Sequence, residues 1–334
     1  MFKKILSTLL LAAVGITPLL AKDKINGAGA SFPAPLYYGW AFDYRKDTKN
    51  RVNYQSIGSG GGIKQITKRV VDFGASDKPL NTKKLAKGKL LQFPAVIGSI
   101  VIAFNVEGIA DATLKLKNET VADIFAGRIT KWNDAAIKTD NPDIKLPDAK
   151  IIVVHRSDGS GTTYNFTYYL SGSSKNWKEN FGTGKAIDWA TGIGGKGNEG
   201  VANLVKQTPN SIGYIENAYK EKNNLSAAVL ETASGKWVQA TEANFKAAAK
   251  YASWTKKDHF YAMLALQPGE TSYPIVAATF ILLPIEKPEM NKKVIKFYDY
   301  AFMNGDAGAK KLGYIPLPDA TKKMIREYWA QNIK

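Results

Sequence analysis

One arrangement occurs three times along this chain: an apolar strand, a turn rich in glycine and serine, and a helix. In its clearest copy, the β-branched run Ile151–Val154 has the composition of a buried strand. The turn Arg156–Thr163 follows, and Phe166, Tyr169 and Leu170 then fall at the i, i+3 and i+4 spacing of a helix with one buried face. Strands that alternate with helices predict an α/β fold.

The turn Arg156–Thr163 has the chemistry of an anion site. Hydroxyl groups, free backbone N–H groups and the positive end of a helix dipole meet there, and Arg156 adds a forked cationic donor. The alternative is a Ser/Thr-capped helix start with a surface arginine, which would explain a single turn of this kind. The two further copies of the arrangement favour the anion site.

The second copy lies near the N-terminus. The small, glycine-rich segment Ile25–Ala30 precedes Ser31–Pro35, which opens a helix with Ser31 as a plausible N-cap. We expect free N–H groups around Ala30, Ser31 and Phe32 to face a ligand, although capping alone would also explain the serine.

The third copy contains the sharpest glycine run in the chain. The segment Val52–Ile57 has the residue types of a strand, the turn Gly58–Gly62 follows, and Ile63, Ile66 and Val70 then mark a helix. Glycine lets a backbone approach an oxyanion closely, and Ser59 supplies a hydroxyl group. A flexible linker would lack periodic segments on both sides, so we interpret this turn as part of a site.

An acidic residue follows the next strand. The segment Val70–Asp77 is predicted to be a short strand that ends in an acid, with Pro79 two residues later. An acid beside an anion repels it unless a proton lies between them. Asp77 could therefore accept a hydrogen bond from a protonated oxyanion, hold Arg156 in place, or do both. An Asp turn before proline is the alternative.

A fourth glycine-rich segment, Gly192–Gly200, only looks like a phosphate loop. It lacks the Gly-Lys-Ser/Thr ending of a nucleotide-binding loop, and no clear strand precedes it. Because Val201, Leu204 and Val205 follow at helical spacing, we interpret it as the start of a helix.

The first 21 residues have the layout of a cleavable signal peptide. Lys3 and Lys4 precede the apolar run Ile5–Leu20, and polar residues follow Ala21. A membrane anchor is the alternative, but the apolar run is short for a spanning helix and contains Pro18. We therefore predict export, with cleavage after Ala21.

Composition excludes several classes of site. The chain has no cysteine, so it has no disulfide, catalytic thiol or lipid-anchor cysteine. With only His155 and His259, a zinc site would need mostly carboxylate ligands, so we expect no metal. The formal charge of +17 attracts anions. Because the chain is exported, nucleic acid is the least expected of these.

The chain resembles the phosphate-binding protein family of bacterial phosphate ABC transporters, across essentially the whole mature sequence and in order. The most specific motifs are Gly27–Pro35, Tyr54–Gly62, Asp72–Asp77 and Arg156–Thr162. Further similarity is found at Lys131–Trp132, Gly194–Asn198, Ile212–Tyr214 and Thr279–Leu282.

The resemblance implies a two-lobed periplasmic-binding-protein fold of the α/β class, each lobe a sheet flanked by helices, with the ligand in the interlobe cleft. The first lobe is expected to be discontinuous, 22–102 plus 279–334, and the second to cover 103–278. From the spacing of its apolar residues, the segment after Lys287 is expected to form helices that pack on the first lobe.

The resemblance also implies a function. A monomer would bind inorganic phosphate in the periplasm with high affinity and deliver it to the transmembrane permease subunits by hinge closure, without chemistry and without a cofactor. The phosphate-binding residues carried over from the family are Ala30, Ser31, Phe32, Ser59, Asp77, Arg156, Ser160, Gly161 and Thr162. Two positions depart from the family pattern: Ser31 replaces a frequent threonine, and Gly60 replaces a frequent serine.

The residues leave two alternatives open. One is a phosphate-ester-binding hydrolase with Ser160 as nucleophile, for which His155 is a nearby candidate base. His155 and Arg156 are neighbours on a strand, so their side chains should point to opposite faces. The other is a basic surface protein that binds polyanions, although Trp40 and Tyr169 fall at core-like spacing rather than in a stacking stripe.

Overall fold

The computed structural model describes residues 23–334. The predicted signal peptide, residues 1–21, lies outside the described residues. Within the described part of the chain, no helix has both the length and the apolar character needed to cross a membrane.

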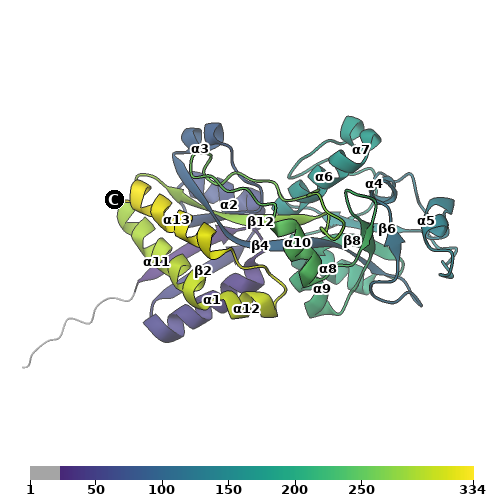
Figure 1. Cartoon of the computed structure of the whole chain (residues 1–334), viewed down its shortest axis with the longest axis horizontal. Coiled ribbons are helices and arrows are strands. Elements are labelled where there is room, and N and C mark those ends of the chain that lie inside the picture. Colours follow the sequence, from purple (N-terminus) through teal and green to yellow (C-terminus); the bar gives the residue numbers. More distant parts are fainter. Residues whose placement is uncertain (1–22) are drawn as a thin grey trace, which may run out of the picture.

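One long sheet runs through the molecule in the order β2-β1-β3-β12-β4-β8-β6-β7, and β9 pairs with β4. Helices cover both faces (Figure 1). The strands of this sheet are β1 (Lys24–Gly29), β2 (Arg51–Ser56), β3 (Phe73–Ser76), β4 (Leu90–Asn105), β6 (Ile152–Arg156), β7 (Ile193–Gly195), β8 (Ser211–Glu216), β9 (Ser226–Ala227) and β12 (Val276–Pro284). A small second sheet is formed by β5 (Lys115–Leu116), β10 (Val229–Glu231) and β11 (Trp237–Val238).

Strand β4 belongs to both halves of the long sheet. Its first part, Leu90–Ser99, pairs with β12, and its second part, Ile100–Asn105, pairs with β8. Every residue of β4 before Asn105 is buried, as its apolar composition predicts. We call the part built on β2, β1, β3, β12 and residues 90–99 the first lobe, and the part built on residues 100–105, β8, β6, β7 and β9 the second lobe.

The helices of the first lobe pack on opposite faces of its sheet. On one face, α2 and α3 bury Ile66 and Leu85 in a cluster with Leu282. On the other face, α1 packs against α11, where Tyr44 contacts Phe297 edge to face. These helices are α1 (Ala34–Thr48), α2 (Gly58–Thr67), α3 (Thr82–Gly88), α11 (Pro288–Asn304), α12 (Asp306–Lys311) and α13 (Asp319–Asn332).

The prediction for the C-terminal segment is confirmed. Tyr298 of α11 and Trp329 of α13 both pack edge to face on Phe93 of the first lobe. In Figure 1 these yellow helices cover the half of the sheet that carries β2.

The second lobe has a similar layered construction. Phe166 of α6 stacks on Tyr214 of β8, and Phe125 of α4 packs edge to face on Phe166. Helix α8 covers β6 and β8. Its helices are α4 (Asn118–Phe125), α5 (Ala135–Asp140), α6 (Gly161–Ser173), α7 (Lys175–Asn180), α8 (Gly197–Gln207), α9 (Asn217–Asn223) and α10 (Glu242–Ala249).

The segment between α10 and β12 reaches back onto the first lobe. Trp254 packs edge to face on Phe280, Phe260 packs on Tyr328, and Gln92 Nε2 donates to the carbonyl of His259 at 3.0 Å. The sequence division placed all of 103–278 in the second lobe. That division remains a prediction. Residues 254–260, which it assigns to the second lobe, contact the first lobe.

Two local expectations about the third strand–turn–helix copy are wrong. The run Gly58–Gly62 lies inside α2 rather than in a turn before it, and Val70 lies beyond the end of α2, with 66% of its surface exposed. These glycines lie inside the helix because the backbone of α2 approaches the backbones of β1 and β3 closely. A methyl group added to Gly62 would lie 2.5 Å from the Cα of Gly29 and 2.7 Å from the carbonyl oxygen of Ala75. Glycine therefore allows α2 to lie directly on β1 and β3.

This packing predicts that Gly62→Ala lowers the free energy of unfolding by about 1–3 kcal/mol, because the added methyl group collides with backbone atoms that cannot move aside. The measurement is urea unfolding of the mature chain followed by circular dichroism. Gly39→Ala in α1 is the matched control, since Gly39 is exposed and a methyl group there meets nothing within 4 Å. It should raise stability by about 1 kcal/mol. Equal stability of Gly62→Ala and the wild type would contradict the close approach.

Candidate anion-binding site

Residues from both lobes converge where three helices begin. A methyl group on Gly161, at the start of α6, would lie 2.4 Å from Ser59 Oγ and 2.7 Å from Asp77 Oδ2. The Gly60 N–H donates to the carbonyl of Gly159 across the cleft at 2.7 Å. The structure therefore brings the predicted residues of α2, β3 and α6 together.

The polar side chains of this cluster are almost completely withdrawn from solvent. Each is at most 3% exposed: Ser31, Ser59, Asp77, Arg156, Ser160 and Thr162. Buried polar groups need partners, so the hydrogen-bonding state of each one decides what the cluster can hold.

Three hydroxyl groups have oxygens that accept bonds from the protein. Ser31 Oγ accepts from the backbone N–H of Asn198 at 3.0 Å and from its Nδ2 at 2.9 Å. Thr162 Oγ1 accepts from Arg156 Nη1 and from Asn198 Nδ2, both at 3.2 Å. Ser160 Oγ accepts from the Thr163 N–H at 2.9 Å. Since a hydroxyl group carries one hydrogen, each of these three can donate it to a ligand.

Arg156 is held by Asp158 in a two-pronged ion pair. Its Nε donates to Oδ1 at 2.7 Å and its Nη2 donates to Oδ2 at 2.6 Å. Burial alone would raise the pKa of Asp158, but the bonds from Arg156 hold that pKa below its usual value. A guanidinium group has five N–H donors, so Arg156 keeps two beyond the three bonded to Asp158 and Thr162. The sequence left open whether Asp77 holds Arg156, and in the structure Asp158 does so.

Asp77 is the single acid among the predicted site residues. Its backbone N–H donates to Ser59 Oγ at 3.1 Å, and Ser59 Oγ lies 3.4 Å from Asp77 Oδ2. Its Oδ1 is buried and accepts no bond from the described part of the chain. Burial raises the pKa of Asp77 to about 7. The carboxyl group can therefore exchange a proton with a bound oxyanion near neutral pH.

The backbone donors of the cluster are only partly available. The Ala30 N–H donates to the carbonyl of Ala75 at 3.0 Å, so the expectation of a free N–H at Ala30 is wrong. The Ser160 N–H donates to the carbonyl of Lys185 at 2.9 Å. By contrast, Gly161 and Thr162 stand in the first turn of α6, where N–H groups have no partner within the helix.

Asn198 and Asp158 belong to the cluster and were not predicted to be site residues. Asn198 opens α8 inside the segment Gly192–Gly200, and the Gly197 N–H donates to Asp158 Oδ1 at 3.0 Å. The interpretation of this segment as the start of a helix is confirmed, but the segment also closes one side of the site. In the sequence, Asn198 is only an asparagine after a glycine turn, with nothing to indicate its partners.

The predicted opposite orientation of His155 is confirmed. Its ring stacks on Trp189, with centroids 4.9 Å apart, and burial lowers its pKa. Ser160 Oγ accepts from Thr163, and within residues 23–334 no hydrogen bond joins it to a histidine or an acid. The same residues contain no group of three or more His, Cys, Asp or Glu side chains that could hold a metal.

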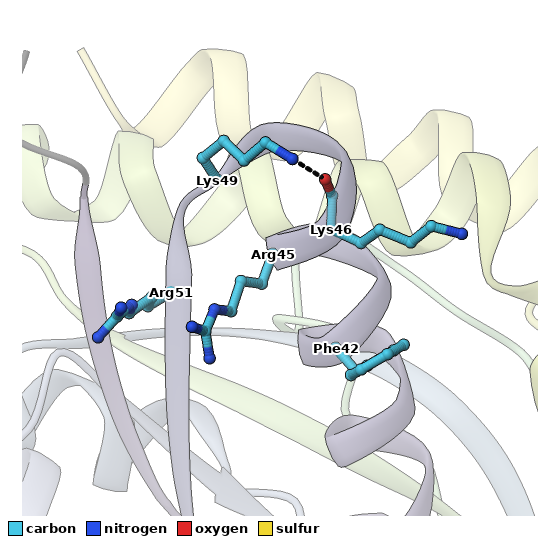
Figure 2. Close-up of a pocket in the computed structure, with 5 residues that line it drawn as sticks. All are labelled: Phe42, Arg45, Lys46, Lys49 and Arg51. Atoms are coloured by element: carbon cyan, nitrogen blue, oxygen red, sulfur yellow. Dashed lines mark hydrogen bonds between the residues drawn. The ribbon is translucent and has the colours of Figure 1, made fainter.

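A different kind of hollow lies on the surface between α1 and β2 (Figure 2). Its volume is about 390 Å³, and it is lined by Phe42, Arg45, Lys46, Lys49 and Arg51. These side chains form no ion pair within the described residues. Lys49 Nζ donates to the carbonyl of Lys46 at 2.8 Å, and Phe42 and Lys46 point away from Arg45 and Arg51 (Figure 2). It therefore lacks the buried, converging donors of the cleft between the lobes.

Comparison with known proteins agrees with this architecture. Residues 18–304 match the family model of the PBP superfamily domain. The phosphate-binding protein PstS of Haemophilus influenzae is 48% identical over 96% of this chain and 97% of its own length. That of Pasteurella multocida is 50% identical over 93% and 91%.

Solved structures confirm the two-lobed α/β fold predicted from the sequence. A phosphate-binding protein from Stenotrophomonas maltophilia superposes with a TM-score of 0.67 at 20% identity and covers 91% of this chain and 93% of its own. The periplasmic phosphate-binding protein PfluDING, solved with phosphate, gives 0.71 at 23% over 91% and 93%. The chain therefore belongs to the PBP superfamily and, within it, to the family of phosphate-binding proteins named PstS.

Proposed function

We propose that this protein binds one inorganic phosphate ion between its lobes and delivers it to the permease of a phosphate ABC transporter. It acts in the periplasm, as a monomer and without chemical change to the ion. The observation that carries the proposal is the buried cluster itself: hydroxyl, guanidinium and backbone donors from both lobes gather around the Asp77 carboxyl group, while Asp158 is occupied by Arg156. The names of the relatives, all phosphate-binding proteins, support the same ligand.

The donor set fits a tetrahedral oxyanion. Ser31 and Ser59 would donate from the first lobe, together with the Phe32 N–H, and the start of α6 would supply Ser160, Gly161 and Thr162 from the second. The positive ends of α2 and α6 add favourable electrostatics. Arg156 would place its two remaining N–H groups on the ion.

Asp77 provides the selectivity of the proposed site. A carboxylate next to an anion is tolerated only if a proton lies between them, and hydrogen phosphate brings that proton. Sulfate brings no proton, so Asp77 itself would have to take one up before sulfate could bind without lone pairs facing each other. Because the pKa of Asp77 is about 7, the Asp77 carboxyl group and a bound phosphate ion would gain and lose their shared proton together.

We further propose that the lobes close on the ion by a hinge motion, with 22–102 plus 279–334 as one lobe and 103–278 as the other. Two features of the sheet lie within three residues of these boundaries. Strand β4 changes its pairing partner between Ser99 and Ile100, and β12 begins at Val276. The bonds from Asn198 to Ser31 and from Gly60 to Gly159 join the lobes and would break on opening.

Binding is favoured over hydrolysis by the state of Ser160. A serine nucleophile needs a base that accepts its proton, and His155, the candidate base, stacks on Trp189 instead. The proposal therefore assigns Ser160 a donating role.

The first prediction concerns selectivity. Above about pH 7, where Asp77 is ionised, the mature protein should bind phosphate more tightly than sulfate, since sulfate is accepted only when Asp77 itself takes up a proton; the ratio should widen about tenfold with each further pH unit. Asp77→Asn should narrow this ratio by at least about tenfold, because an amide can donate to sulfate. Titration calorimetry with both ions measures the ratio. If the wild type bound both ions with comparable affinity, Asp77 would not be the residue that discriminates phosphate from sulfate.

The second prediction concerns Arg156. Arg156→Ala should weaken phosphate binding by about 1.5 kcal/mol or more, because it removes a charged donor and leaves the Asp158 carboxylate beside the ion. Arg156→Lys keeps the positive charge but lacks the two-pronged guanidinium donor, so it should lose less phosphate affinity than Arg156→Ala. Arg45→Ala, in the surface hollow of Figure 2, is the control and should leave the dissociation constant unchanged. The same dissociation constant for Arg156→Ala and wild type would exclude Arg156 from the site.

The third prediction concerns stability without ligand. The pKa of Asp77 is about 7 in the folded protein and about 4 in an unfolded chain. The folded state therefore binds more protons between these values, and the contribution of Asp77 to stability is complete below about pH 4 and is lost as the pH rises to about 7. Between pH 5 and 8, the wild type should lose about 3 kcal/mol of unfolding free energy relative to Asp77→Asn. Urea unfolding at several pH values measures this difference, and parallel profiles would contradict it.

A further inference from the structure

Glu216 is a fully buried acid outside the predicted site. It is the last residue of β8, it is 0% exposed, and it pairs with Ile100, where β4 passes from one lobe to the other. Within the described chain it forms no ion pair with a lysine or arginine. A buried acid without a cation needs another explanation for its presence.

Its carboxyl group lies between the start of α9 and the C-terminal segment. Oε2 accepts a bond from the Ala218 N–H at 2.7 Å and lies 3.1 Å from the hydroxyl oxygen of Tyr314. Oε1 lies against β4, where a methyl group on Gly98 would be 3.2 Å away, and it has no hydrogen-bond partner among the described residues.

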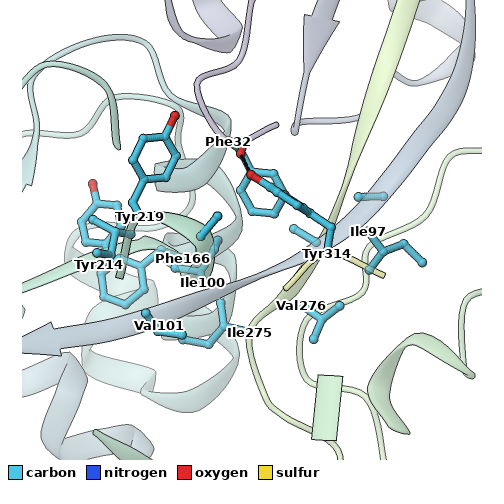
Figure 3. Packing of buried hydrophobic residues seen from close by; sticks show 14 of the residues in the cluster. Phe32, Ile97, Ile100, Val101, Phe166, Tyr214, Tyr219, Ile275, Val276 and Tyr314 are labelled. Carbon is cyan, nitrogen blue, oxygen red and sulfur yellow. Dashed lines mark hydrogen bonds between the residues drawn. The ribbon is translucent and has the colours of Figure 1, made fainter. Parts of the chain in front are cut away.

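Tyr314 joins this carboxyl group to the first ligand loop. Its hydroxyl group lies 2.6 Å from the carbonyl oxygen of Phe32. Figure 3 shows the side chains of Tyr314 and Phe32 next to each other beside β4. Their rings meet edge to face, with centroids 6.3 Å apart. Phe32 is one of the predicted phosphate-binding residues.

Counting hydrogens assigns the protonation state of the pair. A carbonyl oxygen can only accept, so the one hydroxyl hydrogen of Tyr314 goes to Phe32. The contact between Tyr314 and Glu216 then needs a hydrogen from the carboxyl group. Without that hydrogen, two lone pairs would face each other at 3.1 Å, and the buried Oε1 would carry charge with no donor.

The surroundings of Glu216 favour the neutral acid on balance. Burial raises the pKa of Glu216 well above its usual value; the contacts with Ala218 and Tyr314 oppose this rise, and the charge of Asp77 adds to it. Tyr314 and Tyr219 also face this region, and burial raises the pKa of each phenol. Glu199 Oε1 lies 3.1 Å from the Tyr219 hydroxyl oxygen. Both phenols therefore stay neutral near neutral pH.

The loop held by this pair is the one that would supply backbone donors to the ligand. Tyr314 fixes the Phe32 carbonyl, and Tyr219 donates to the Ser31 carbonyl at 2.7 Å. The Glu216 N–H donates to Asn198 Oδ1 at 2.9 Å, which turns Nδ2 of Asn198 toward Ser31 and Thr162. The backbone of Glu216 thus orients Asn198, and its side chain contacts Tyr314, which holds the Phe32 carbonyl.

We propose that Glu216 is a positioning residue that must be protonated: its carboxyl hydrogen bonds to Tyr314, which commits the hydrogen of Tyr314 to Phe32 and fixes the Ser31–Phe32 loop for the ligand. The inference rests on the proposed phosphate site but concerns a residue that does not touch the ion. Loss of the Glu216 proton would release this loop and weaken phosphate binding.

The protonation state can be measured without any ligand. Carbon-13 NMR of protein labelled at the glutamate carboxyl carbon, with each signal assigned through its own backbone amide, reports each residue separately. Glu216 should show the shift of a neutral carboxylic acid at pH 7. Glu221, exposed on α9, the helix that Glu216 caps, is the matched reference and should show a carboxylate. A carboxylate shift for Glu216 at pH 7 would overturn the inference, and this measurement needs no variant to fold.

Phosphate titration then tests the positioning role. Glu216→Gln keeps a neutral donor and acceptor, so its affinity should stay within about threefold of wild type, whereas Glu216→Ala and Tyr314→Phe should each lose about tenfold. Wild-type affinity should fall at alkaline pH more steeply than that of Glu216→Gln, which has no proton to lose. Glu221→Gln is the control and should match wild type.

The outcomes separate this inference from the proposed function. If Glu216→Gln loses as much affinity as Glu216→Ala, or if both pH profiles coincide, Glu216 has no proton-dependent role even though phosphate binds. If the wild type fails to bind phosphate, the proposed function is wrong, and the NMR result still decides the state of Glu216.

Discussion

The structure depends on matching hydrogen-bond donors and acceptors where the two lobes meet. Arg156 can be buried because Asp158 covers one edge of its guanidinium group. The hydroxyl groups of Ser31 and Thr162 keep their hydrogens for a ligand because N–H groups of Asn198 and Arg156 already occupy their lone pairs. Asp158 is occupied by Arg156 and Gly197, so the remaining donors exceed the acceptors in this buried region, and Asp77 is the acid left to meet a ligand. An oxyanion that brings a single proton satisfies both kinds of group at once.

Local patterns in the sequence predicted much of this arrangement. A strand followed by a serine and then a helix is recognisable from neighbouring residues, which is why the starts of α1, α2 and α6 were expected to carry the site. The run Gly58–Gly62 shows the limit of that reasoning. Glycines that approach an anion and glycines that let a helix approach a sheet look alike in sequence, and only the contact of Gly62 with Gly29 and Ala75 distinguishes them. The helix start was therefore misplaced, although the side chains predicted to form the site still lie together.

The supporting residues were beyond reach for a related reason. Asn198 is 167 positions from Ser31, and Tyr314 is 98 from Glu216, so nothing in their own surroundings indicates these partners. A buried glutamate at the end of a strand looks like an ordinary helix cap, and it does cap α9. Its second contact, with Tyr314, exists because the C-terminal segment returns to the edge of β4, where Ile315 pairs with Ile97.

Strand β4 gives the relation between the lobes a mechanical character. It is one unbroken strand of 16 residues, tied laterally to β12 along its first part and to β8 along its second. Any rotation of one lobe against the other would be taken up as torsion of this strand near Ser99 and Ile100, because β4 pairs with a different strand on each side of that point. A strand wound in this way stores elastic energy and returns it when it unwinds. The stiffness of a few peptide units would then set how much of the binding energy is retained as affinity.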